Sequence, residues 1–187
     1  MSDVLYQDSE GITIRMACPA DEDAVTHILH EGAAQIAQLG IDQWQTGYPD
    51  REEAQEDIAA GQCMVLETSS GNVVASLALC LGPDTDYEAA DIAWQKAPQQ
   101  NNVVYVAIHR CATLREATGH GYMKLLFEVA AQQSAAQGAY AIRIDTHPGN
   151  TVMRAFLQSC GYRELGPFTP VSYGEGKDVR IAYELVI

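Results

Sequence analysis

The segment Thr118-Gly119-His120-Gly121-Tyr122 has the residue types and spacing of a phosphate-binding turn. It lies between a predicted strand and a predicted helix. Backbone N–H groups at a helix N-terminus attract anions, and the helix dipole adds to that attraction. Glycines let a phosphate approach the backbone closely. The pattern therefore indicates an anion site, although a Gly-x-Gly pair can also do no more than shape a turn.

Other phosphate motifs fit less well. The chain has no Gly-Lys-Ser/Thr of a P-loop, and it lacks the third glycine and the downstream acidic residue of a dinucleotide fingerprint. The formal net charge of −14 makes nucleic acid a poor partner and favours a cationic amine. Any anionic ligand must therefore be held by local donors.

Two histidines are candidates for proton transfer near neutral pH. His109 shares one face of a predicted strand with Tyr105 and Ala107, and His147 follows the end of the next strand. The alternative interpretation of His109 is a structural histidine that forms a hydrogen bond with a neighbouring loop. Cys111 could form a covalent acyl-enzyme, but a small buried strand residue is the simpler interpretation.

Hydrophobic periodicity predicts seven strands and four helices in the order β-α-α-β-β-β-α-β-α-β-β. The strand–helix–strand unit from Val103 to Asp145 should be parallel, and the hairpins antiparallel, which gives a mixed sheet. The predicted strands are Ile12–Met16, Cys63–Glu67, Val73–Leu81, Val103–Thr113, Tyr140–Asp145, a short strand from Tyr162, and Val179–Ile187. The predicted helices run from Asp21 to Gly40, Arg51 to Ala60, Gly119 to Gln137 and Asn150 to Cys160.

The 187 residues, 47 % of them hydrophobic, fit a single globular domain over 1–187. We expect a flexible N-terminus over 1–11 and an insertion loop over 83–102, where Tyr87 and Trp94 form a lid or a dimer contact. No apolar run is long enough to cross a membrane, and no secretory signal is evident, so we expect a cytoplasmic protein without membrane partners. Five scattered cysteines predict neither a disulfide framework nor a metal site.

Several segments taken together resemble the GNAT superfamily of N-acetyltransferases. They are Ile108–Thr113, Thr118–Gly121, Ile142–His147, Asn150 and Leu157-x-x-x-Gly161-Tyr162, and the resemblance extends from Ile12 to Ile187. It implies an α/β fold with a mixed, largely antiparallel sheet of six or seven strands, helices on both faces and a central splayed parallel pair. It also implies direct transfer of an acetyl or other acyl group from acyl-CoA to a primary amine of a small molecule or peptide.

The resemblance assigns roles to particular residues. The end of the long strand would hold the pantetheine arm, the glycine turn would wrap the pyrophosphate, and the last helix would contact the cofactor. The connection between the first two helices would line the acceptor site, or else plug the sheet. In that order the residues are Cys111, Ala112 and Thr113; Thr118, Gly119, His120, Gly121, Tyr122 and Met123; Asn150, Met153 and Phe156; and Trp44 and Tyr48, with His109 and His147 as catalytic candidates.

The chain departs from the family pattern at three positions. Thr118 and Met123 replace a basic or amide residue and a small residue of the phosphate motif, and Leu157 replaces a tyrosine that protonates the leaving thiolate. Arg115 is an alternative source of positive charge. These departures leave two other functions open, a non-catalytic CoA-binding or sensory module and a GNAT-derived interaction scaffold. A homodimer is also open.

Overall fold

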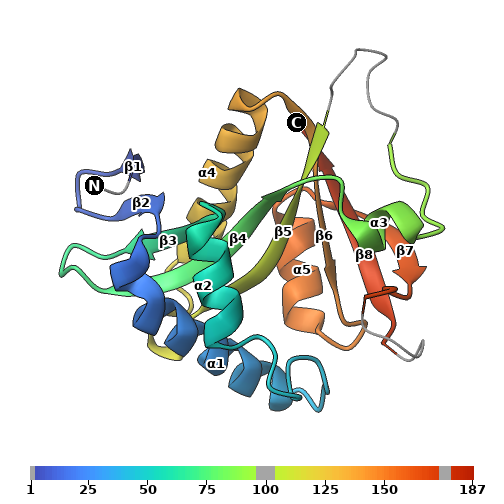
Figure 1. Cartoon of the computed structure of the whole chain (residues 1–187), viewed down its shortest axis with the longest axis horizontal. Coiled ribbons are helices and arrows are strands. Elements are labelled where there is room, and N and C mark those ends of the chain that lie inside the picture. The colour runs from blue at the N-terminus through green and yellow to red at the C-terminus, as the bar shows by residue number, and fades with distance from the viewer. Residues whose placement is uncertain (1–2, 96–103, 173–177) are drawn as a thin grey trace. The chain divides into compact units, whose positions relative to one another are not determined.

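The computed structural model describes residues 3–95, 104–172 and 178–187. Eight strands form one sheet in the order β1-β2-β3-β4-β5-β6-β8-β7 (Figure 1). The chain divides into two compact units, Met1–Leu79 with His109–Ala130, and Cys80–Ile108 with Ala131–Ile187. Each unit is described in turn.

The first unit contains an antiparallel run of four strands, β1 (Val4–Gln7), β2 (Thr13–Met16), β3 (Cys63–Glu67) and β4 (Val73–Leu81). Both faces of β3 are buried, because its residues alternate between them and Cys63 to Leu66 are all buried. On one face, Cys63 and Val65 pack with apolar residues of α1 (Glu22–Ala37) and α2 (Arg51–Ala59).

The two helices of this unit lie side by side (Figure 1). Val25 and Leu29 of α1 and Ala54 and Ile58 of α2 form their shared buried cluster. Asp50 begins α2 in a capping box, in which its backbone N–H donates to the Glu53 carboxylate at 2.7 Å. The connection of residues 38–50 between the helices is therefore anchored at its far end.

The second unit contains the parallel ladder between β5 (Val104–Thr113) and β6 (Ala139–Thr146), which runs from Val104 to Ala107 on β5. The end of β5 from His109 belongs to the first unit. β6 pairs antiparallel with β8 (Arg180–Val186), and β8 with β7 (Arg163–Phe168). The helices of this unit are α3 (Thr85–Ala89) and α5 (Thr151–Ser159). The 3-10 helices η1 (Pro19–Asp21) and η2 (Arg115–Ala117) belong to the first unit, and α4 (Tyr122–Ala136) begins in the first unit and ends in the second.

The predicted fold class is confirmed, but the sheet has eight strands rather than six or seven. The missed strand is β1, which lies within the 1–11 segment. It has only four residues, none of them buried, so it lacks the alternation that would have predicted it. Part of the predicted 83–102 insertion is the short helix α3, and residues 96–102 lie outside the described residues.

The glycine turn before α4 also shortens the predicted helix. α4 begins at Tyr122 and not at Gly119, because Gly119 and Gly121 have φ angles of +81° and +79°, which a right-handed helix excludes. Within the described ranges, every helix is too short or too polar to span a membrane.

A buried ion pair ties β2 to the start of α1. The two terminal guanidinium nitrogens of Arg15 donate to the Asp21 carboxylate at 2.7 and 2.8 Å, and Arg15 also bonds Glu67. Only 9 % of the Asp21 side chain is exposed. The bond from Arg15 lowers the pKa of Asp21 from 3.8 to about 2.

We expect Asp21→Asn to lower the free energy of unfolding by about 2 kcal/mol at pH 7. A carboxyl whose folded pKa lies below its unfolded value stabilises the protein above the unfolded pKa. That contribution is lost as the pH falls from about 4 towards 2, so the gap between wild type and variant should close over this range. Urea unfolding at pH 7, 5, 4 and 3 measures it.

Asp23→Asn is the matched control, because Asp23 pairs with Arg51 at the surface, where an ion pair contributes little. A gap between wild type and Asp21→Asn that stays constant down to pH 3 would contradict the assignment.

Candidate functional site

β5 bends at Arg110, which has a φ of +46°. Such an angle is uncommon for a residue other than glycine and was not predicted from the sequence. The Arg110 guanidinium binds both carboxylate oxygens of Asp57 at 2.7 Å, and its third nitrogen donates to the Tyr48 hydroxyl at 2.9 Å. The bend therefore joins the strand to α2 and to the α1–α2 connection.

The strand end after the bend is Cys111–Thr113, the predicted pantetheine segment. Gly32 of α1 allows close packing there, because a Cβ on Gly32 would lie 2.8 Å from the Cβ of Ala112. The side chain of Gln35 donates to the Thr113 carbonyl at 3.0 Å. A bound pantetheine arm would therefore use other backbone groups of this segment.

The glycine turn at the start of α4 is open. No neighbouring heavy atom lies within 4 Å of a Cβ placed on Gly119 or Gly121. The Gly121 carbonyl accepts from the Leu125 N–H at 3.0 Å, so Gly121 caps the helix. The N–H groups of residues 122–124 lie in the first helical turn, where no intrahelical acceptor exists. This arrangement suits a diphosphate, which needs several converging donors.

The side chains around the turn differ in their roles. The Thr118 hydroxyl donates to the Arg115 carbonyl at 2.8 Å and so closes η2. The rings of His120 and Tyr122 stack at 5.3 Å between centroids. Arg115 is exposed and lines a hollow of about 300 Å³ with His27, Glu31, Leu114 and Glu116.

The predicted acceptor residues Trp44 and Tyr48 both lie beside the strand end. A Cβ on Gly32 would meet the Trp44 ring at 3.2 Å, and Tyr48 bonds Arg110. Both side chains are half-buried. In the first unit, the structure thus brings together the predicted pantetheine segment and the predicted acceptor residues.

The two catalytic candidates have different surroundings. His109 is half-buried and directly precedes the bend in β5. His147 follows β6 in the second unit, and its Nδ1 accepts the Gly149 N–H at 3.0 Å. A neutral His147 ring therefore has its proton on Nε2, where it can donate but not accept.

The predicted cofactor residues of the last helix lie in the second unit. Asn150 is buried and caps α5, because its side-chain oxygen accepts the Met153 N–H at 3.1 Å. Met153 and Phe156 are half-buried on the same helix. Capping explains the asparagine in structural terms, and its contact with the cofactor remains a prediction.

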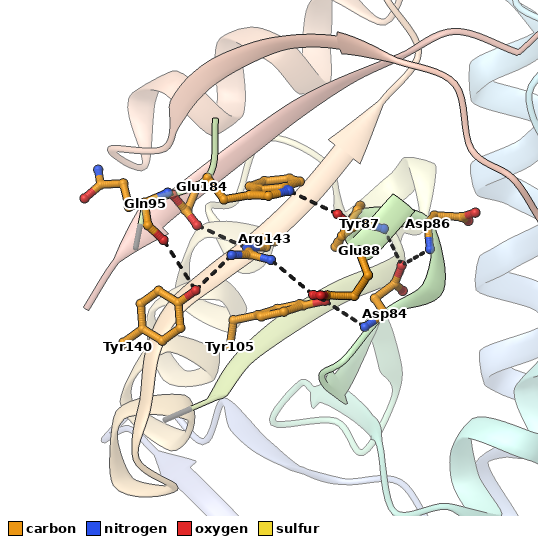
Figure 2. A network of polar contacts seen from close by, with 10 residues as sticks. Asp84, Asp86, Tyr87, Glu88, Gln95, Tyr105, Tyr140, Arg143 and Glu184 are labelled. Carbon is orange, nitrogen blue, oxygen red and sulfur yellow. Dashed lines mark hydrogen bonds and ion pairs between the residues drawn. The ribbon is translucent and has the colours of Figure 1, made fainter. Parts of the chain in front are cut away.

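A second polar centre in this unit was not predicted (Figure 2). Arg143 of β6 is 4 % exposed, and its guanidinium carbon lies 4.3 Å from the Trp94 ring centre and 3.8 Å from that of Tyr105. It binds the fully buried Glu184 at 3.1 Å and donates to the Tyr140 hydroxyl at 2.8 Å. The cation is therefore paired and stacked between two rings.

The same centre anchors α3. The Tyr87 hydroxyl donates to Asp145 at 2.9 Å, and the Tyr105 hydroxyl donates to Glu88 at 3.0 Å (Figure 2 shows the second contact). Burial raises the pKa of Tyr105 to about 12 and, with the Asp145 charge, holds the pKa of Tyr87 well above its usual value. Both hydroxyls thus stay protonated. Tyr87 is 1 % exposed, so it belongs to the core and forms neither a lid nor a dimer contact.

A cavity of about 440 Å³ adjoins this network, lined in part by Trp94, Tyr105, Tyr140 and Arg143. The Arg143 guanidinium already covers the rings of Trp94 and Tyr105, so the network fastens the segment before residue 96 to the sheet. In the described part of the chain, no group of three or more His, Cys, Asp or Glu side chains forms a metal cluster.

Solved structures of similar fold are numerous. A GNAT-family acetyltransferase from Streptococcus agalactiae is 27 % identical, with a TM-score of 0.78 over 97 % of this chain and 99 % of that one. One from Listeria monocytogenes is 17 % identical, with a TM-score of 0.69 over 99 % and 100 %. A third, a putative acetyltransferase from Salmonella typhimurium solved with acetyl-CoA, is 18 % identical, with a TM-score of 0.64 over 94 % and 93 %.

The sequence matches no curated protein significantly. The model of the acetyltransferase (GNAT) family, however, matches residues 30–162, which is well over half of the chain. That range includes the bend in β5, the glycine turn and α5. The resemblance in the sequence is thereby confirmed, and the chain belongs to the GNAT acetyltransferase family.

Proposed function

We propose that this chain is an N-acyltransferase that moves an acetyl or other acyl group from acyl-CoA to a primary amine of a small molecule or peptide. Membership of the GNAT family supports acyl transfer from acetyl-CoA in general, and the amine acceptor is our proposal. The observation that carries it is the open turn at Gly119 and Gly121, directly before the first turn of α4.

The turn supplies donors that do not depend on a basic side chain. The Thr118 hydroxyl is occupied by the Arg115 carbonyl, so it does not replace the missing arginine or glutamine. Backbone N–H groups and the helix dipole remain, and these fixed partial charges attract a pyrophosphate even on a protein of net charge −14. The departures from the phosphate motif are therefore compatible with cofactor binding.

Each unit contributes one histidine to the proposal, and their roles are separate. Acyl-CoA supplies a thioester carbonyl, and the attacking amine must lose a proton as the C–N bond forms and the C–S bond breaks. His109 would accept that proton directly or through water. His147 accepts the Gly149 N–H at Nδ1, so its neutral ring carries a proton at Nε2 and would donate a hydrogen bond to the negatively charged thiolate sulfur without giving up the proton. The thiolate is a fairly good leaving group and needs no acid in place of the tyrosine that the family has at Leu157, a side chain that is fully buried here.

The acceptor would lie against the α1–α2 connection. Trp44 and Tyr48 offer aromatic faces to a cationic amine before it is deprotonated. The acidic surface would raise the local concentration of such amines. Trp44 and Tyr48 also pack against the strand end, so the same residues can seal the site from water.

The proposal predicts that acetyl-CoA raises the melting temperature in a saturable way, because it binds only the folded chain. Gly121→Val should weaken acetyl-CoA binding at least tenfold, since a β-branched residue is strained at a φ of +79° and crowds the turn. Calorimetric titration measures the affinity.

Gly71→Val is the matched control. Gly71 has a φ of +82° in the β3–β4 turn, and a Cβ placed there also meets no atom within 4 Å. Both substitutions should lower stability by a similar amount, roughly 1–3 kcal/mol, while only Gly121→Val weakens binding. Equal affinities in the two variants would exclude this turn as the phosphate site.

Turnover should depend on both histidines. We expect His109→Gln and His147→Gln each to lower kcat by about 10²–10⁴ in a thiol-release assay with the best amine of a screen, and to leave acetyl-CoA affinity within twofold. His30→Gln is the control, because His30 is exposed and bonds Asp50 at 2.7 Å. Binding without thiol release for any amine would favour a CoA-binding module, and no binding would favour a scaffold.

A further inference from the structure

The bend in β5 is unfavourable for the residue that occupies it. Arginine is less stable in the left-handed region than in an ordinary strand conformation, because its Cβ lies too close to the following carbonyl oxygen. Such a conformation persists only where the surroundings enforce it, and these places are often functional. Here the enforcing contacts are the three hydrogen bonds from the Arg110 side chain to Asp57 and Tyr48.

Asp57 is itself in an unusual place. Asp57 is 6 % exposed and lies in the last turn of α2, at the negative end of the helix dipole. A buried carboxylate there is destabilising without a cation beside it. Arg110 supplies that cation in a two-pronged contact, with 17 % of its own side chain exposed. The pair therefore holds α2 and the bend in one fixed relation.

The bend separates the part of β5 that pairs with β6 from the part proposed to bind the pantetheine arm. The parallel ladder with β6 runs from Val104 to Ala107, and the strand continues to Thr113. A left-handed residue rotates the chain, and so redirects the N–H and C=O groups that follow it. Those groups belong to Cys111–Thr113, the segment proposed to hold the pantetheine arm as an added strand would be held.

We propose that Arg110 is a positioning residue for the pantetheine arm of acyl-CoA. Held by Asp57 and Tyr48, it keeps the bend in place and aims the backbone of Cys111–Thr113 at the ligand. This inference rests on the proposed function, since it requires that acyl-CoA binds along β5. It assigns no contact between Arg110 and the phosphates, which the glycine turn holds.

The first unit contains a matched pair for comparison. Arg15 binds Asp21 through two nitrogens at 2.7 and 2.8 Å, with side-chain exposures of 13 % and 9 %. Arg110 also binds Asp57 through two nitrogens, Nε and one terminal nitrogen, both at 2.7 Å. Lysine keeps the charge but lacks the planar guanidinium that binds a carboxylate through two nitrogens. Arg15→Lys and Arg110→Lys therefore remove the same type of contact at two different positions.

The test compares two ligands by calorimetry, acetyl-CoA and 3′-phosphoadenosine 5′-diphosphate, which lacks the pantetheine arm. Arg110→Lys should bind acetyl-CoA at least tenfold more weakly and the nucleotide within twofold of wild type. Arg15→Lys should leave the ratio of the two affinities unchanged, even where it lowers the melting temperature as much.

Two further variants separate backbone conformation from side-chain loss. Arg110→Gly can adopt the left-handed region freely and Arg110→Ala cannot, so the glycine variant should retain more acetyl-CoA affinity than the alanine variant. Asp57→Asn keeps the shape and removes the charge, and should reproduce Arg110→Lys if that variant folds poorly.

Each failure has its own signature. A wild-type chain that binds neither ligand contradicts the proposed function. A wild-type chain that binds both, with affinity ratios that Arg110→Lys and Asp57→Asn leave unchanged, overturns the positioning role alone. Equal loss of both ligands in these variants does the same, because it indicates a general effect on the fold.

Discussion

The limited hydrogen-bonding capacity of the backbone is the constraint on which the site depends. A strand residue has one N–H and one C=O, and a group engaged in a ladder is not available to a ligand. β5 meets this constraint by pairing with β6 over Val104–Ala107 and bending at Arg110. The surrounding elements hold this bend in place. Asp57 of α2 and Tyr48 of the α1–α2 connection bind Arg110, and Gly32 lets α1 approach the strand end.

The few positive charges of the chain are largely used inside the protein. The chain has 11 lysines and arginines against 25 aspartates and glutamates. Arg15, Arg110 and Arg143 are largely buried and each is paired with a carboxylate. With these three cations engaged, the proposed site for an anionic ligand relies on main-chain dipoles at the start of α4. Such dipoles are fixed by the fold and do not titrate.

Much of the fold could be predicted from local patterns, and the bounds predicted for β3 and β4 match the structure. Their apolar runs are interrupted by a turn around Gly71, a strong short-range signal. β1 was missed because its burial depends on pairing with β2 rather than on its own pattern. The glycine turn before α4 and the connection between α1 and α2 were also located by short-range order, and their binding roles stay predictions. The Arg110–Asp57 contact was missed because its partners are far apart in sequence. One local signal did exist, since Asp57 lies at helical spacing from the buried Ala54 and Ile58, which places it on the buried face of α2.

The stack around Arg143 bears on which changes the segment from α3 to Trp94 can tolerate. Trp94 and Tyr105 cover the guanidinium, and Tyr87 bonds Asp145 from within the core. A chain without α3 and Trp94 would leave the Arg143–Glu184 pair open to solvent on that side, and a buried pair that loses part of its surroundings is destabilising. The segment and the arginine therefore depend on each other for stability. A close relative that lacks one is expected to carry an apolar or small residue in place of the other.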